Sequence, residues 1–374
     1  MATEKFDVII VGAGPAGVGM GVTLQEMGLE NFILLDRHEV GASFARWPAE
    51  MRLITPCFTS NGFGPPDLNA VTYHTSPAHM LQKGHPTGLE YAYYLKNVAE
   101  HFELPIRTGV EVEAVKPNAT GQGFEVQTSI GQLATQFVIW AAGEFQYPWL
   151  DPFPGAEHCL HNSTVSSWAK LEGDSFVVIG GYESGLDAAY NLSKRGKEVV
   201  VLDRQFRWES RPTDPSRGLA PFTHSRLRSA LNKGRLDLQG DVTIDGVERN
   251  GQGYFVFAED GRMWHSPTRP ILALGFSGSL TLVDNLFDWH EEGYPLLTEQ
   301  DESIETPGLF LVGPEVRHGQ VIFCFIYKFR QRFAVVAQAI GERLGLETEA
   351  LEMYRRHHMF LDDLSCCNVE CAAC

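Results

Sequence analysis

Four cysteines stand within the last nine residues of the sequence, in the segment SCCNVECAAC. Cys366 and Cys367 are adjacent, and Cys371 and Cys374 are separated by two alanines, which is a spacing that a redox-active dithiol can use. Three other cysteines precede them. Such a cluster could exchange with disulfides through its thiolates, or hold a metal ion or an iron–sulfur cluster.

Acidic neighbours bear on the choice between these two chemistries. Asp362, Asp363 and Glu370 surround the four cysteines with negative charge, which disfavours the thiolate that exchange requires. A metal site does not suffer from this field, but C-C-x3-C-x2-C is an uncommon spacing for structural zinc. Three interpretations therefore stay open: a thiol relay, which we rank first, a metal or cluster site, and a terminus without chemistry.

A second chemical pattern is a glycine-rich turn between an apolar strand and a helix, in FDVIIVGAGPAGVGMGVTLQEMG. Gly12, Gly14 and Gly17 fit the spacing G-x-G-x-x-G, which permits a tight turn, close approach to a pyrophosphate and close packing of helix on strand. Asp36 ends the next strand, where it can accept hydrogen bonds from a ribose, and Arg37 follows it. The pattern predicts a dinucleotide bound at the amino end of the helix.

The same order of strand, glycines and helix returns in SFVVIGGYESGLDAAYNLSKRG, followed by the strand EVVVLDR. Tyr182 stands where the middle glycine belongs and would crowd a pyrophosphate unless its side chain turns outward. Nicotinamide cofactor binding and a domain kept only for structure are both open interpretations. Asp203 favours an unphosphorylated ribose, whereas a neighbouring arginine could neutralise a 2′-phosphate. The residues predicted to contact the second dinucleotide are Gly180, Gly181, Ser184, Gly185 and Arg204.

Two units of this kind predict an α/β protein with two nested, doubly wound, Rossmann-like dinucleotide-binding domains. The strands are continuous apolar runs, as expected for parallel sheets covered on both faces. We place the first domain at residues 1–147 and 295–365, the second at 148–294, and a cysteine-rich tail at 366–374. A chain of 374 residues agrees with two domains of ordinary size.

Charge and hydropathy exclude several classes of partner. Lys and Arg number 30 against 47 Asp and Glu, and a net charge of −17 argues against nucleic acid and anionic membranes. No stretch of about eighteen apolar residues predicts a membrane-spanning helix. No export signal is visible at the beginning of the sequence, so we expect a cytoplasmic protein with reduced thiols.

Two nested dinucleotide domains resemble the two-dinucleotide-binding flavoproteins, which include flavin-containing monooxygenases, thioredoxin reductases and bacillithiol-disulfide reductase-like proteins. In that superfamily the first domain binds FAD and the second binds NAD(P)H. The segment GASFARWPAEMRLITP, with Trp47, is similar to one that covers the flavin in the monooxygenase branch. FPGAEHCLHNSTVSSW and VIWAAGEFQYP, with Gly143, also resemble monooxygenase segments.

Other segments depart from the motifs of the superfamily. GLFLVGPEVRHGQ resembles the Gly-Asp segment that holds the ribityl chain of the flavin, but Pro314 displaces the Asp, so Gly313 and Glu315 become the candidate cofactor contacts. The cysteine that the bacillithiol group carries in its first glycine loop is Ala16 here. The CxxC of small thioredoxin reductases is absent from the second domain.

The resemblance implies an FAD-dependent oxidoreductase that uses NAD(P)H to reduce a small-molecule or protein disulfide, with the terminal cysteines as a thiol relay. Cys57 is a further candidate for a thiol near the flavin, although a buried small residue competes with that interpretation, and Cys324 is predicted to lie in the core. The alternative is a monooxygenase that oxygenates a small molecule through a flavin C4a-hydroperoxide. A second alternative is a flavoprotein reduced by a ferredoxin-like partner, or a metal or redox sensor. Family analogy implies a homodimer.

Overall fold

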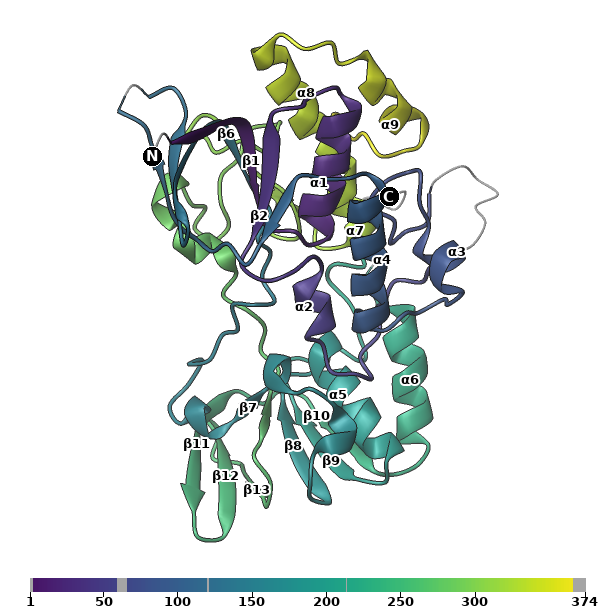
Figure 1. The fold of residues 1–374 in the computed structure, drawn as a ribbon. Coiled ribbons are helices and arrows are strands. Elements are labelled where there is room, and N and C mark those ends of the chain that lie inside the picture. The colour runs from purple at the N-terminus through teal and green to yellow at the C-terminus, as the bar shows by residue number, and fades with distance from the viewer. Residues whose placement is uncertain (1–2, 59–65, 120, 213, 366–374) are drawn as a thin grey trace.

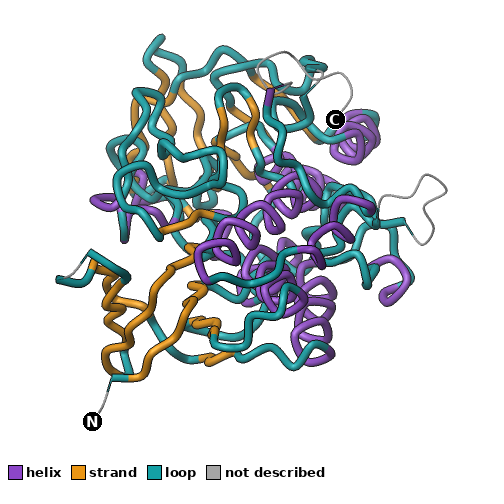
Figure 2. The backbone as a smooth tube through the Cα atoms, turned by 90° about the horizontal axis from the view of Figure 1, so that it is seen from above, coloured by secondary structure: helices purple, strands orange, loops and turns teal. Residues whose placement is uncertain are grey.

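The computed structural model of the chain describes residues 3–58, 66–119, 121–212 and 214–365. Two sheets, one above the other, form two units that are joined by the connections after β6 and before β15 (Figure 1). Most helices gather on one side of the sheets (Figure 2). The α/β class with parallel sheets is therefore confirmed, while the domain boundaries predicted above stay a proposal.

The first sheet follows the order β3-β2-β1-β6-β5-β4, and β15 also pairs with β6. β1, β2, β3, β6 and β15 are parallel, whereas β4 and β5 form an antiparallel meander with β6. The strands are β1 (Glu4–Val11), β2 (Phe32–Asp36), β3 (Ile106–Thr108), β4 (Val112–Pro117), β5 (Phe124–Thr128), β6 (Gly131–Trp140) and β15 (Leu309–Leu311).

The helices of the first unit come from both ends of the sequence, because the chain returns to this unit after it has built the second. α1 packs against α4 and α8. The helices are α1 (Pro15–Glu26), α2 (Ala42–Ala45), α3 (Pro77–Leu81), α4 (Gly88–His101), α7 (Ile326–Phe329), α8 (Phe333–Leu344) and α9 (Glu352–Arg356).

The second unit has a parallel sheet in the order β10-β9-β8-β14-β7, and a separate antiparallel sheet in the order β11-β12-β13. Its elements are β7 (Leu160–His161), β8 (Ser175–Ile179), α5 (Glu183–Lys194), β9 (Glu198–Leu202), α6 (Pro221–Leu231), β10 (Leu236–Gln239), β11 (Ile244–Asn250), β12 (Gly253–Ala258), β13 (Met263–Ser266) and β14 (Ile271–Leu272). The hairpin of β16 (Arg317–His318) and β17 (Val321–Ile322) follows β15.

Short 3₁₀ helices complete the chain. They are η1 (Ala156–His158), η2 (Asn162–Thr164), η3 (Trp168–Lys170), η4 (Ser279–Leu282), η5 (Asp284–Leu286), η6 (Arg330–Arg332) and η7 (Glu349–Leu351). The carboxylate of Glu50, which follows α2, connects the two units. It accepts hydrogen bonds from the Ser167 hydroxyl and the Trp168 amide at the start of η3, at 2.8 and 3.0 Å. It also accepts a hydrogen bond from Arg195 of α5 at 2.9 Å.

Candidate functional site

The first glycine turn connects β1 to α1 and has the geometry that its spacing predicts. Gly12 has φ +108°, and a Cβ there would lie 2.5 Å from the carbonyl oxygen of Ala141. A Cβ on Gly17 would lie 1.9 Å from the Gly12 carbonyl oxygen, so the helix packs directly on the turn. Gly14 is different, because a Cβ there would meet no atom within 4 Å. The open side of the turn is therefore at Gly14.

Asp36 completes the first turn from the end of β2. Its carboxylate accepts hydrogen bonds from the amides of Ala13 and His38, each at 2.8 Å. These bonds hold the acid beside the amino end of α1, whose N-cap residue Gly14 supplies no side chain to the first-turn amides. Free amides at this end of a helix favour an anionic group.

The second glycine turn, between β8 and α5, repeats this framework. A Cβ on Gly180, at φ +108°, would lie 2.4 Å from the Ala273 carbonyl oxygen, and a Cβ on Gly185 would lie 1.8 Å from the Gly180 carbonyl oxygen. Asp203 accepts hydrogen bonds from the amides of Gly181 and Gln205, at 2.6 and 2.8 Å. The backbone of both turns is therefore built in the same way.

Side chains distinguish the second turn from the first. The Tyr182 hydroxyl donates to the carbonyl oxygens of Ser216 and Gly218, at distances of 3.3 and 2.9 Å. The indole of Trp208 packs so closely that a Cβ on Gly181 would lie 2.7 Å from it. Side chains of the protein therefore stand at the second turn where the first turn is open at Gly14.

A cavity of about 340 Å³ opens between the two units. It begins at Gly12 and Gly14 on the first turn and reaches Glu183 and Ser184 on the second. The wall between the two turns is largely apolar. The aromatic residues on that wall are Phe44, Trp47, Phe145, Phe276, Phe325 and Phe329.

Two carboxyl groups near the cavity have raised pKa values. Glu144 follows Gly143 on the cavity wall, and no residue that the structure describes hydrogen-bonds its side chain. Desolvation raises the pKa of Glu144 above its ordinary value. Burial, and then the charge of Glu144, raises the pKa of Glu315 to about 8. Glu144 could not be predicted from the sequence, because a single acid after Gly143 belongs to no cofactor-binding motif.

Glu315 itself turns away from the cavity. Its carboxylate accepts a hydrogen bond from the Ser279 hydroxyl at 3.2 Å, and it lies against Gly278. Pro314 lines the cavity instead, and Gly313, at φ +115°, packs against Ala16. Glu315, the acid expected to contact a cofactor, therefore contacts the start of η4 instead.

Cys57 is buried and does not line the cavity. The Asn69 side chain donates a hydrogen bond to its sulfur at 3.1 Å. Burial, and then the charge of Asp67, raises the pKa of Cys57 to about 12. The structure thus favours a packed thiol at this position over a reactive one.

Cys324 was expected in the core, and that prediction is wrong. Its side chain is exposed on the wall of the cavity, whereas Phe323 before it is buried. The cavity walls still desolvate the thiol, which raises the pKa of Cys324 above its ordinary value. The apolar run VIFCFIYKF suggested a core strand, but only β17 is extended there and the chain then turns into α7.

These environments predict how the thiols react. At pH 8, iodoacetamide should modify Cys324 and leave Cys57 and Cys159 unmodified, because the latter two are buried and burial raises the pKa of each to about 12. Because the pKa of Cys324 is also raised, its alkylation should become faster as pH rises. Saturating FAD should slow that alkylation by filling the cavity. Peptide mass mapping measures this, and modification of Cys57 before Cys324 would contradict it.

The remaining predicted residues fall into four groups. Gly12, Gly14, Asp36, Trp47, Gly143 and Ser184 line the cavity. Arg37 lies at its edge, where it donates to the Gln146 side chain at 3.2 Å and stacks on the Tyr147 ring. Arg204 is exposed beside the second turn. Cys366, Cys367, Cys371 and Cys374 lie outside the described residues.

Comparison with known proteins agrees with this architecture. Residues 9–313 match the family described as pyridine nucleotide-disulphide oxidoreductase. The chain is 32% identical over 197 residues to an uncharacterized oxidoreductase, CzcO, of Bacillus velezensis, covering 50% of this chain and 52% of that protein. It is 24% identical over 320 residues to a ferredoxin–NADP reductase of a Bradyrhizobium species, covering 83% of each. The chain spans about half the length of the first curated relatives that it matches.

Solved structures show the same fold. The bacillithiol disulfide reductase of Staphylococcus aureus superposes with a TM-score of 0.73 at 19% identity, over 91% of this chain and 99% of that one. A flavin-containing monooxygenase from Stenotrophomonas maltophilia gives a TM-score of 0.69 at 17% identity, over 91% and 100%. Reductases and monooxygenases thus share this architecture.

The chain belongs to the pyridine nucleotide-disulphide oxidoreductase family. Proteins of this family typically bind FAD and NAD(P)H. The first turn fits such a dinucleotide, because the space at Gly14 is open and Asp36 stands beside it. The second turn does not fit a dinucleotide as long as the Tyr182 and Trp208 side chains keep the positions described above. In the part of the chain that the structure covers, no helix is long and apolar enough to cross a membrane.

Proposed function

We propose that the protein is an FAD-dependent oxidoreductase that uses NAD(P)H to reduce a disulfide. The observation that carries the proposal is the cavity, whose wall includes both glycine turns and the thiol of Cys324. An electron donor held at the second turn and a flavin held at the first would then share one desolvated space. The proposed FAD domain comprises residues 1–147 and 295–365, and the NAD(P)-binding domain comprises residues 148–294.

The first turn supplies the contacts for FAD in this proposal. The amides at the start of α1 would face the diphosphate, and Asp36 would accept hydrogen bonds from the ribose. Bound FAD would supply two-electron transfer between the nicotinamide and the acceptor. Trp47 and the other aromatic side chains would keep water out of the cavity. Glu144, with its raised pKa, would hold a proton for a group that is being reduced.

The acceptor in this proposal is a small-molecule or protein disulfide, and the terminal cysteines relay electrons to it. The relay is supported by the spacing of these cysteines in the sequence. The cysteines themselves lie outside the described residues. Cys324 faces the cavity and could exchange with them. A homodimer, in which one chain's tail serves the partner, belongs to the same proposal.

Monooxygenation is the alternative, and one observation favours it. Among the residues that the structure describes, Cys324 is the cysteine that lines the cavity, so no dithiol is completed there. An aromatic cavity with Glu144, whose pKa is raised, on its wall suits oxygenation of a small apolar substrate equally well. In that case the cysteines of the tail would have a separate role, such as a metal or redox sensor.

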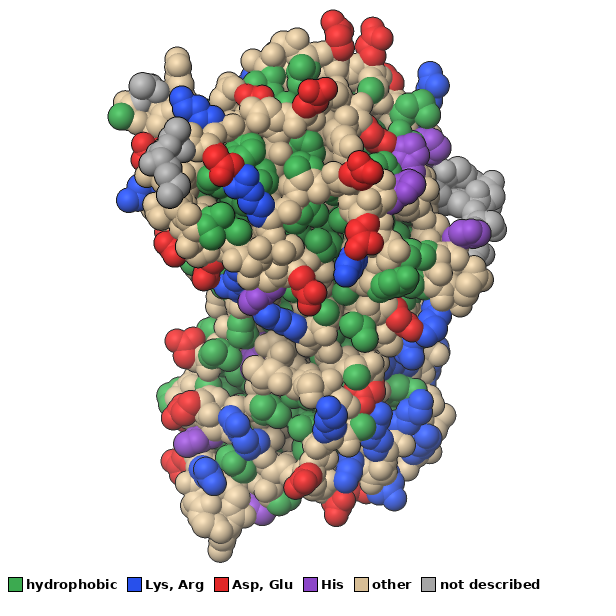
Figure 3. Space-filling model, viewed as in Figure 1, with side chains coloured by type: hydrophobic (Ala, Val, Ile, Leu, Met, Phe, Trp, Pro, Cys, Tyr) green, Lys and Arg blue, Asp and Glu red, His purple; other side chains and the backbone are tan. Residues whose placement is uncertain are grey.

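A protein electron donor is the second alternative. The turn that would hold NAD(P)H is filled by side chains, and the surface around it is basic. Residues 181–240 contain eleven Lys and Arg against seven Asp and Glu, in a chain of net charge −17. Figure 3 shows basic side chains gathered on the second unit. A small acidic, ferredoxin-like protein would be complementary to that surface.

Anaerobic reduction distinguishes these functions. NADH or NADPH added to the FAD-loaded protein without oxygen should bleach the flavin absorbance. An aromatic disulfide should then restore that absorbance and release its thiol. If oxygen restores the absorbance only when a substrate is oxygenated, and the disulfide does not, the monooxygenase alternative holds. If neither nucleotide bleaches the flavin but a reduced ferredoxin does, the donor is a protein.

A further inference from the structure

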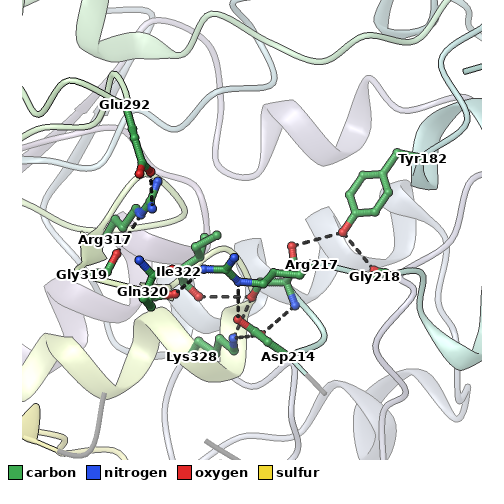
Figure 4. Close-up of polar contacts among 11 residues, drawn as sticks. Tyr182, Asp214, Arg217, Gly218, Glu292, Arg317, Gly319, Gln320, Ile322 and Lys328 are labelled. Carbon is green, nitrogen blue, oxygen red and sulfur yellow. Dashed lines mark hydrogen bonds and ion pairs between the residues drawn. The ribbon is translucent and has the colours of Figure 1, made fainter. Parts of the chain in front are cut away.

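Residues 214–220, which we name the strap, lie across the second glycine turn and connect it to the first unit. The strap leads into α6, and its last residues Gly218, Leu219 and Ala220 are buried in the second unit. Asp214 and Ser216 are half-buried. Figure 4 shows the polar contacts that the strap makes on both sides.

On the second unit, the strap is fixed by Tyr182, which replaces the middle glycine of the motif, and by Glu183, which follows it. The Tyr182 hydroxyl donates to the Ser216 and Gly218 carbonyl oxygens (Figure 4). The Glu183 carboxylate accepts a hydrogen bond from the Ala220 amide at 2.6 Å. In the first turn the matching positions are Gly14 and Pro15, which make no such bonds. The residue that departs from the motif and the one after it are therefore the ones that bind the strap.

On the first unit, the strap is fixed by the segment after β16. The ammonium group of Lys328 donates to Asp214 and to the Ser216 hydroxyl, both at 2.7 Å. Arg217 donates to the carbonyl and side-chain oxygens of Gln320, at 3.2 and 2.6 Å (Figure 4). These contacts hold the strap against the first unit, although its last three residues are buried in the second unit.

One contact brings the strap to the cavity. The Ser216 side chain lies beside that of Cys324, the thiol on the cavity wall, and partly offsets the rise that burial causes in the pKa of that thiol. The Ser216 hydroxyl also donates to the Ile322 carbonyl oxygen at 3.2 Å. Movement of the strap away from Tyr182 would therefore also change the surroundings of Cys324.

We propose that the strap is a gate: the nicotinamide cofactor binds at the second glycine turn only after residues 214–220 leave Tyr182 and Glu183. The inference rests on the proposed use of NAD(P)H. In the positions that they now occupy, the Glu183 carboxylate at the start of α5 would repel a diphosphate, and Tyr182, which replaces a glycine, would crowd it. Once the strap has left, Tyr182 loses both hydroxyl bonds, and Glu183 keeps the hydrogen bond from the Thr223 hydroxyl of α6. The backbone of the turn matches that of the first. Cofactor entry and exposure of Cys324 are then coupled.

Loosening the strap tests the gate from one side. The Tyr182→Phe variant loses both hydroxyl bonds to the strap, so NAD⁺ or NADP⁺ should bind the FAD-loaded protein about three- to tenfold more tightly, as expected for hydrogen bonds of ordinary net strength. Isothermal titration calorimetry measures the affinity. Tyr190→Phe is the matched control, because Tyr190 lies on the same helix and its ring contacts Arg226 and Lys194. An unchanged affinity in Tyr182→Phe would contradict the gate.

A disulfide that fixes the strap in place tests the gate in the opposite direction. In Ser216→Cys the new thiol faces Cys324, and diamide should oxidise the two thiols to a disulfide, which peptide mapping identifies. Nucleotide affinity should then fall at least about tenfold, because the disulfide closes the gate. A phosphine reductant should restore the affinity. The control Ser216→Cys/Cys324→Ser cannot form this bond and should not respond to diamide.

The outcomes separate the gate from the proposed function. If NAD(P)H bleaches the wild-type flavin and the locked protein binds nucleotide as well as the reduced one does, the gate is wrong and the function stands. If neither nucleotide binds to wild type or to Tyr182→Phe, and neither bleaches the flavin, both proposals are overturned.

Discussion

Replacement of Gly14 by valine should abolish FAD binding and leave the fold intact. A Cβ at Gly14 meets no protein atom within 4 Å, and the backbone there, at φ −80°, suits any residue. The added side chain would fill the space that we assign to the diphosphate. FAD affinity should fall at least about 100-fold, the equivalent of about 3 kcal/mol. Fluorescence titration with FAD measures it.

Two other glycines provide the controls. Gly84→Val also adds a side chain where no atom lies within 4 Å, but far from the glycine turn in sequence, so FAD affinity should not change. Gly17→Ala should instead destabilise the protein, because its Cβ would lie 1.9 Å from the Gly12 carbonyl oxygen. Thermal unfolding should show Gly14→Val near wild type and Gly17→Ala well below it. Full FAD affinity in Gly14→Val would contradict the proposed cofactor site.

Removal of residues 366–374 should reduce disulfide reduction at least about 100-fold, as expected when a relay that carries every electron is lost. Reduction of the flavin by NAD(P)H should stay at the wild-type rate, because the two glycine turns are unchanged. Stopped-flow absorbance separates the two half-reactions. The double variant Cys371→Ser/Cys374→Ser should share the loss if that pair is the relay, and Cys366→Ser/Cys367→Ser if the adjacent pair is.

A tail with intact thiols is the control for this deletion. Ala372→Ser/Ala373→Ser changes the same segment and keeps all four cysteines, so its disulfide reduction should match wild type. Unchanged disulfide reduction in the truncated protein would remove the relay from the proposed function. Substrate-dependent oxygen uptake in that truncated protein would then favour the monooxygenase alternative.

The framework of both glycine turns could be predicted from the sequence, because it depends on local spacing. Gly12 and Gly180 adopt the same left-handed conformation, and Asp36 and Asp203 make equivalent bonds to the turns. A capping box at Thr87 can also be predicted, because Glu90 follows three residues later, and its two reciprocal hydrogen bonds are present. In each case the interacting groups are close in the sequence, at most 23 positions apart.

Features that depend on distant contacts could not be predicted in this way. The spacing of Leu89, Tyr93 and Phe102 predicts a shared apolar face on the helix that follows Thr87, but Leu89 and Tyr93 are exposed. The buried face contains Tyr91 and Tyr94 instead, whose hydroxyls find partners in Asn69 and Thr75. Hydrophobicity alone would bury Leu89 before either tyrosine, so tertiary contacts, including these hydrogen bonds, decide which residues are buried.

The second turn illustrates the same limit. The sequence showed that Tyr182 would have to turn outward for a cofactor to bind, but not which segment its hydroxyl contacts. Ser216 and Gly218 are more than thirty positions away in the chain, and no motif links them to the turn. Cys324 was misplaced for a similar reason, because its exposure is to a cavity formed by both units.

The FAD content of the purified chain tests the central claim most directly. After incubation with excess FAD and removal of the free cofactor, we expect one FAD per chain by absorbance, and almost none in Gly14→Val. A wild-type chain that folds but retains no FAD would show that the turn at Gly12 to Gly17 does not hold a flavin, and the electron transfer proposed for the cavity would then be wrong.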